Sequence, residues 1–119
     1  MTNKEVAEKT KELVDNYQFT TVSMITKRDR CSDQKSRNWL NDKTKWSALK
    51  IEGKFFYINI NEKEYFNKIM DMFSCGELTT VSKMRFDINM SGSHCREILN
   101  NSNVWEAVPI DGRNIYIKK

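Results

Sequence analysis

An internal repeat constrains the fold of this chain more than any other feature of its sequence. The tetrapeptide Thr20-Thr21-Val22-Ser23 returns as Thr79-Thr80-Val81-Ser82. With that offset and no gap, residues 20–60 align with residues 79–119, and 14 of the 41 aligned pairs are identical. Most repeated positions hold large apolar residues, a turn glycine or helix-capping residues, which determine a fold. The identical pairs include Ser32/Ser91, Arg37/Arg96, Leu40/Leu99, Asn41/Asn100, Trp46/Trp105, Ala48/Ala107, Ile51/Ile110, Gly53/Gly112, Tyr57/Tyr116 and Ile58/Ile117.

Two segments rich in Lys and Asn can resemble each other by composition alone. Paired Trp, Gly and Tyr residues in a gapless register are not explained in that way, so we interpret the chain as two tandem copies, residues 1–60 and 61–119. The first copy ends at Ile60 and the second begins at Asn61, with no Gly-, Ser- or Pro-rich linker between them. We therefore expect the two copies to pack rigidly against each other.

Each copy begins with helical periodicity. One helix is expected at residues 3–17, and its counterpart at residues 62–73, with Cys75-Gly76 as a helix stop. Further helices should start at the Thr-Thr pairs and at Ser32 and Ser91, because hydroxyl side chains cap free backbone amides. The expected apolar faces of the first helices are Val6, Leu13, Val14 and Tyr17, and Phe66, Ile69, Met70 and Phe73; those of the third helices are Ser36, Trp39 and Leu40, and Cys95, Ile98 and Leu99.

After the third helix of each copy, the apolar pattern becomes alternating. Two short strands are expected around Glu52-Gly53 and two more around Asp111-Gly112, because an acidic residue before Gly between strands is a strong hairpin signal. Trp46, Ala48, Phe56 and Ile58 belong to the first pair of strands, and Trp105, Ala107, Ile115 and Ile117 to the second pair.

Three helices followed by a β-hairpin resemble the winged helix-turn-helix superfamily, once in each copy. The resemblance lies in the order of the elements and in their caps. It implies an α+β fold of two tandem, rigidly packed winged-helix units, each with three helices and a β-hairpin wing. It also implies that the helix from Ser32 to about Asp42 reads base edges in the major groove of DNA.

The side chains of that helix suit base reading, although a solvated helix face has a similar composition. Arg and Lys match acceptors on guanine, and Asn and Gln match adenine. Residues 1–60 hold 12 Lys+Arg and 8 Asp+Glu, whereas residues 61–119 hold 8 of each. Phosphate contacts supply much of the affinity for nucleic acid, so the first copy is the expected DNA-binding unit. The predicted DNA-binding residues are Lys27, Arg28, Arg30, Gln34, Lys35, Arg37, Asn38, Asn41, Lys54, Arg96 and Arg113.

The sequence contains no recognisable catalytic motif. It has no paired-carboxylate signature, phosphate-binding glycine loop or metal-ligand cluster, so we expect no enzyme activity, no cofactor and no metal. The repeat places Trp39, Trp46 and Trp105 in the core rather than on a base-stacking surface. Three widely spaced cysteines without a Cys-x-x-Cys pair argue against disulfides and favour a cytoplasmic protein. No apolar run approaches the roughly 20 residues that span a membrane.

The first functional hypothesis is a double-stranded DNA-binding protein that regulates transcription. The chain contains 14 Lys and 12 Asn, and such a composition is typical of proteins encoded by AT-rich genomes, such as those of phages and mobile elements. A net charge of only +4 and a neutral second copy leave an alternative open. In it the chain is a protein-interaction module that binds and modulates a host enzyme, such as RNA polymerase or a nuclease, through its second unit. Both a monomer and a homodimer agree with the sequence.

Overall fold

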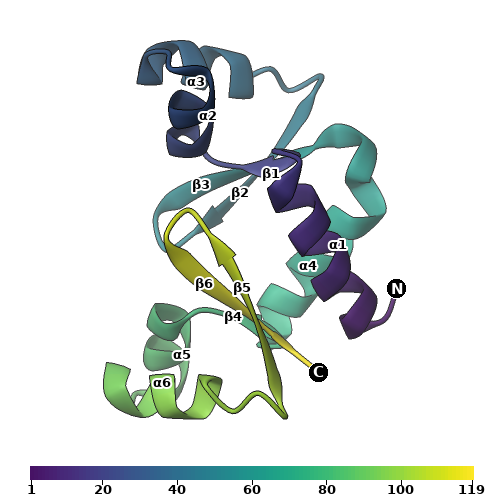
Figure 1. Cartoon of the computed structure of the whole chain (residues 1–119). Coiled ribbons are helices and arrows are strands. Elements are labelled where there is room, and N and C mark those ends of the chain that lie inside the picture. The colour runs from purple at the N-terminus through teal and green to yellow at the C-terminus, as the bar shows by residue number, and fades with distance from the viewer.

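The order of helices and strands in the first half of the chain returns in the second half (Figure 1). The computed structural model describes all 119 residues as an α+β fold. The first half contains α1 (Asn3–Asp15), β1 (Phe19–Thr20), α2 (Val22–Asp29), α3 (Asp33–Leu40), β2 (Trp46–Ile51) and β3 (Lys54–Asn59). After the short 3-10 helix η1 (Ile60–Glu62) follow α4 (Lys63–Cys75), β4 (Leu78–Thr79), α5 (Val81–Ile88), α6 (Gly92–Leu99), β5 (Trp105–Ile110) and β6 (Arg113–Lys118).

Each half contains a three-stranded antiparallel sheet, in the order β1-β3-β2 or β4-β6-β5. The two hairpins predicted from the sequence are confirmed. Glu52 and Gly53 have φ values of 53° and 77°, and Asp111 and Gly112 have 51° and 76°. Two successive residues with positive φ form the tight turn that matches the twist of a hairpin. The two-residue strands β1 and β4 were not expected from the sequence.

The predicted helix starts are confirmed, and one predicted end is wrong. The side chains of Thr21, Thr80, Ser32 and Ser91 each accept a hydrogen bond from a backbone amide in the first turn of the following helix. Helix α4 ends, as expected, at Gly76, which is left-handed with φ 83°. Helix α1 ends at Asp15 rather than at Tyr17. Because φ of Tyr17 is 55°, the helix cannot include it.

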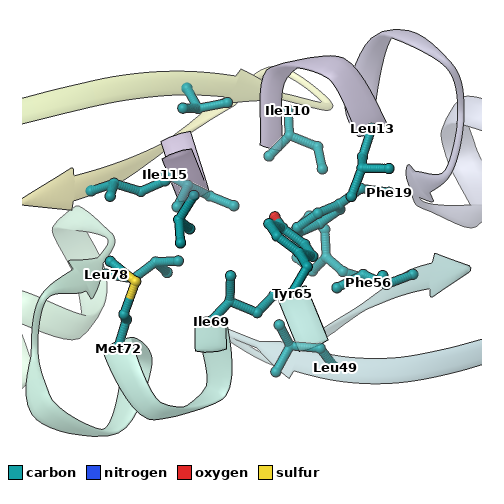
Figure 2. Packing of buried hydrophobic residues seen from close by; sticks show 14 of the residues in the cluster. Leu13, Phe19, Leu49, Phe56, Tyr65, Ile69, Met72, Leu78, Ile110 and Ile115 are labelled. Atoms are coloured by element: carbon teal, nitrogen blue, oxygen red, sulfur yellow. The ribbon is translucent and has the colours of Figure 1, made fainter. Parts of the chain in front are cut away.

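One hydrophobic core is shared by the two halves. Its sixteen buried residues come from α1, α4 and the strands of both sheets. Figure 2 shows α4 residues among residues of both hairpins: Tyr65 and Ile69 lie between Leu49 and Phe56 on one side and Ile110 and Ile115 on the other. The buried hydroxyls of Thr10 and Tyr65 are 2.7 Å apart and join α1 to α4. Helix α1 also packs against β5 and β6, so the N-terminal helix covers strands of the other half.

The other face of each sheet packs on the adjacent pair of short helices. Ile25, Leu40, Trp46 and Tyr57 form a small cluster in the first half, and Leu99, Trp105 and Tyr116 form one in the second. One face of each hairpin thus packs on the shared core, and part of the other face packs on a pair of short helices. Phe56 and Ile58 face the shared core, whereas Trp46 faces α2 and α3. Ala48 and Ala107 are exposed.

Trp39 differs most from its expected environment. Its side chain is 41% exposed and lies edge-on to the buried Trp46, with ring centroids 5.1 Å apart. It therefore covers the small cluster from outside instead of filling it. Of the three Trp residues expected in the core, Trp46 and Trp105 are buried.

None of the helices is both long and apolar enough to cross a membrane.

Candidate nucleic-acid interface

The orientation of α3, the second short helix of the first half, is fixed by its cap and by its contacts with α2. Ser32 caps its first turn, and the buried Ser36 lies where α3 crosses α2. The hydroxyls of Ser36 and Thr26 are 2.9 Å apart, and Thr26 also donates to Asp33. Leu40 is buried beside Ile25 at the far end of the helix. These contacts leave the opposite side of α3 in solvent.

The sequence-predicted residues on α2 and α3 are all exposed: Lys27, Arg28, Arg30, Gln34, Lys35, Arg37, Asn38 and Asn41. The structure brings Gln34, Arg37, Asn38 and Asn41 onto one stripe, because residues three and four apart share a helix face. Gln34 donates to the Asn38 side chain at 2.9 Å, which orients both amides.

Arg28 is less free than its neighbours. It forms an ion pair with Asp29, and its guanidinium lies 4.7 Å from the Tyr17 ring centroid and 5.8 Å from that of Trp39. The hydrogen bond with Asp29 raises the pKa of Arg28 further, although burial acts in the opposite direction. Arg28 thus packs over Tyr17 and Trp39, and its charge is partly neutralised by Asp29.

The surface charge of the two halves differs sharply on the same scaffold. Residues 27–54 contain nine Lys+Arg and four Asp+Glu, whereas the aligned residues 86–113 contain two Lys+Arg and four Asp+Glu. Of the nine basic side chains, only Arg28 and Lys54 form ion pairs. The seven others are Lys27, Arg30, Lys35, Arg37, Lys43, Lys45 and Lys50. Cations without an ion pair are thus concentrated on one half of the molecule.

A groove runs between α3 and the first hairpin. Phe55 lies in its wall and is 50% exposed, and the Lys50 ammonium lies 5.6 Å from the Phe55 ring centroid. The aligned residues of the second half are Asn114 and Pro109, so this aromatic and basic pair belongs to the first half only. The groove is lined by Val22, Ser23, Arg37, Asn41, Gly53, Lys54, Phe55 and Tyr57.

Phe55 and Lys50 are not among the residues predicted from the sequence. A signal for Phe55 was present, because strict alternation places it on the opposite face of the strand from the buried Phe56. The comparison of the two copies does not single out Phe55, because the aligned residue of the second copy is Asn114.

The hairpin-tip residues Lys54 and Arg113 lie where the two halves meet. Lys54 forms an ion pair with Asp111, and Arg113 Nη1 lies 3.1 Å from Glu52 Oε2. Asp111 also accepts a hydrogen bond from Thr21 at the start of α2, and Glu52 accepts one from Thr80 at the start of α5. Each hairpin tip therefore binds the other half in the same way. Lys54 still lines the groove beside Arg37, but both tip cations are neutralised by carboxylates.

Asp111 is the more enclosed of the two tip carboxylates. Burial acts to raise the pKa of Asp111, but hydrogen bonds from Lys54 and Thr21 and the nearby charges of Lys54 and Lys27 lower it more. The pKa of this carboxyl consequently lies below its ordinary value of 3.8. The contact between the halves is thus built around an ionised aspartate.

Arg96 is separated from the other predicted residues. It is exposed on α6, and the α5–α6 pair lies at the opposite end of the molecule from the α2–α3 pair (Figure 1). Beside it, Glu97 is 82% exposed and 3.9 Å from His94. The structure does not bring Arg96 together with the basic surface of the first half.

No protein-family model and no curated protein matches this chain.

Proposed function

We propose that the chain binds double-stranded DNA through its first half, as a tandem winged-helix protein that regulates transcription in a phage or mobile element. The observation that carries this proposal is the contrast between the halves. Nine basic residues lie between Lys27 and Lys54, against two in the aligned segment, and seven of the nine have no ion pair. A structural role would not require the charge to gather in one of two similar units.

The order of elements supports the winged-helix part of the proposal. Each half has a helix, a short strand, two helices and a hairpin, and the second of the two short helices has a hydroxyl cap and a polar outward face. In helix-turn-helix proteins that helix enters the major groove. On this reading the stripe of Gln34, Arg37, Asn38 and Asn41 contacts base edges, while Lys27, Arg30 and Lys35 contact phosphates.

The hairpin adds a different kind of contact. Phe55 and Lys50 stand beside the groove that Arg37 and Asn41 line. An exposed ring at this position suits apolar contact with a thymine methyl group or a sugar. The tip cations Lys54 and Arg113 contribute less, because Asp111 and Glu52 already neutralise them.

The repeat supplies a matched experiment. Arg37 and Arg96 occupy aligned positions in the two halves, so R37A and R96A make the same change on α3 and on α6. We expect R37A to weaken binding to a selected duplex by about tenfold or more, as loss of a base contact does, and R96A to change it little. K35A should weaken binding to all duplexes and lower the salt dependence by about one counterion.

Two results would refute this assignment. One is equal loss of affinity in R37A and R96A, and the other is no duplex binding by the unaltered chain at about 50 mM salt, where phosphate contacts are strong. The second result would favour the alternative, a module that binds and modulates a host enzyme. That alternative draws on the second half, whose aligned segment carries fewer basic than acidic residues.

A further inference from the structure

The C-terminal end of α5 and the turn that follows it expose apolar side chains that the aligned residues of the first half lack. Phe86 is 88% exposed, and Ile88 and Met90 are also exposed large hydrophobic residues. The aligned residues of the first half are Lys27, Asp29 and Cys31. We call Phe86, Ile88 and Met90 the apolar tip. Because the shared fold does not require apolar residues at these positions, their exposure points to a contact with another molecule.

We propose that the apolar tip joins two copies of this chain in a two-fold contact. In such a contact the same surface meets itself, so net charge on it would produce repulsion. Phe86, Ile88 and Met90 carry no charge themselves. Lys83 and Asp87 neutralise each other at 2.7 Å, Arg85 and Arg96 have no ion pair, and the exposed Glu97 lies with Arg96 on the helix packed against α5. Cations and anions are thus both present to face their opposites in the second copy.

The first half cannot take this role, because its equivalent segment carries Lys27, Arg28 and Arg30. Two such segments would repel each other. The two helix pairs lie at opposite ends of the molecule (Figure 1), so contact through the apolar tip leaves α3 exposed in both copies. A partner joined there does not compete with the basic surface.

The size of the apolar tip sets the strength of the contact. A stable interface buries about 800 Å² on each partner, whereas one exposed aromatic side chain contributes about 150–250 Å². Three side chains therefore predict a weak dimer that dissociates at low concentration. If the proposed DNA binding holds, copies on neighbouring sites would reach the high local concentration at which such a contact forms.

Sedimentation velocity without DNA tests the proposal, so its outcome does not depend on the proposed function. The chain is measured from about 10 µM to about 1 mM, the range in which a weak contact becomes populated. We expect the weight-average sedimentation coefficient to rise toward that of a dimer. F86K places the first-half residue in the apolar tip and should remain monomeric. M70K makes the same change at an exposed apolar residue of α4 and should behave as the unaltered chain.

Far-UV circular dichroism of F86K checks that the substitution leaves the fold intact, as expected for a side chain in solvent. A monomer over the whole range would overturn the proposal, as would equal self-association of F86K and the unaltered chain. Growth beyond a dimer would also overturn it, because an open series of contacts joins unlike surfaces rather than the same surface.

Discussion

At the scale of single residues, the hairpin-tip carboxylates explain how two small units hold together. Asp111 lies at the N-terminus of α2, and Glu52 at the N-terminus of α5. Backbone amides at a helix N-terminus favour negative charge, and each carboxylate also faces a cation from the opposite hairpin. The acidic residue before each turn glycine, seen in the sequence only as a hairpin signal, therefore has a second role.

Asp111→Asn should destabilise the chain in a pH-dependent way. The pKa of Asp111 is lowered in the folded state, so the stability that its charge supplies is present above the ordinary value of 3.8 and is lost as the pH falls through the lower folded pKa. We expect a loss of about 1–2 kcal/mol at pH 7, less than for a fully buried charged hydrogen bond because Lys54 is partly solvated. The loss should shrink toward pH 2. Urea denaturation at several pH values measures it.

Glu8→Gln serves as the control for this prediction, because Glu8 is exposed and forms no ion pair. It should leave the free energy of unfolding within about 0.5 kcal/mol of the unaltered chain at every pH. If D111N were equally destabilising at pH 7 and pH 2, the ionised carboxylate would not be the source of the effect.

At the scale of elements, sequence reasoning succeeded where the signal is local. The helix starts at Thr21, Thr80, Ser32 and Ser91 and the two hairpin turns depend on residues within one turn of the chain. The strands β1 and β4 have two residues each, too few to show a period. Local signals thus place the ends of elements but do not reveal the shortest ones.

Faces were harder to predict than elements. Alternation in a strand assumes one buried face, but each hairpin here is covered on one face by the shared core and on part of the other by two short helices. Trp46 and Phe56 are both buried, yet on opposite faces. A similar limit applies to Trp39, which has the spacing of a core residue but lies at the edge, where solvent covers part of its ring. Hydrophobicity shows that a residue prefers burial and does not identify its partner.

The two helix pairs allow a gain-of-function prediction. H94K and E97N give α6 the residues of α3 at aligned positions, because Lys35 and Asn38 occupy them in the first half. We expect the double variant to bind duplex DNA more tightly at low salt and to show a steeper salt dependence, by about one to two counterions. Affinity measured by fluorescence anisotropy at several salt concentrations tests this.

A charge-matched control separates position from net charge. E64N with N67K makes the same change in charge on exposed positions of α4, on the other side of the molecule from the helix pairs. The control should raise affinity less than H94K with E97N. Equal gains would show that α6 has no special position relative to DNA.

At the scale of the whole molecule, the arrangement of the halves could not be read from the repeat. The unequal charge of the halves is visible in the sequence, and the structure places the α2–α3 pair at one end of the molecule, opposite the α5–α6 pair. The sequence does not show that the hairpin tips meet, because a repeat defines equivalent positions without defining how the copies face each other. The sequence predicts Lys54 and Arg113 as DNA-binding residues but does not reveal that they form reciprocal ion pairs between the halves.

The same arrangement predicts that neither half folds alone. Val6 and Ala7 of α1 belong to a core that also contains Val108 and Ile117, and α1 packs on α4, β5 and β6. Residues 1–60 alone would expose this apolar surface, and so would residues 61–119. A unit of about 60 residues is marginally stable even with a complete core. We expect each fragment to be largely unfolded and the full chain to unfold in one cooperative transition.

Circular dichroism and amide NMR spectra of the two fragments, alone and mixed in equal amounts, provide the test. Each fragment alone should give poorly dispersed amide signals. The mixture should regain the dispersion of the full chain, because the contacts that hold the halves together are noncovalent. A well-dispersed spectrum of residues 1–60 alone would mean that the first half supplies its own core and that the shared core is an accessory contact. Two separate thermal transitions in the full chain would lead to the same conclusion, because a shared core couples the unfolding of both halves.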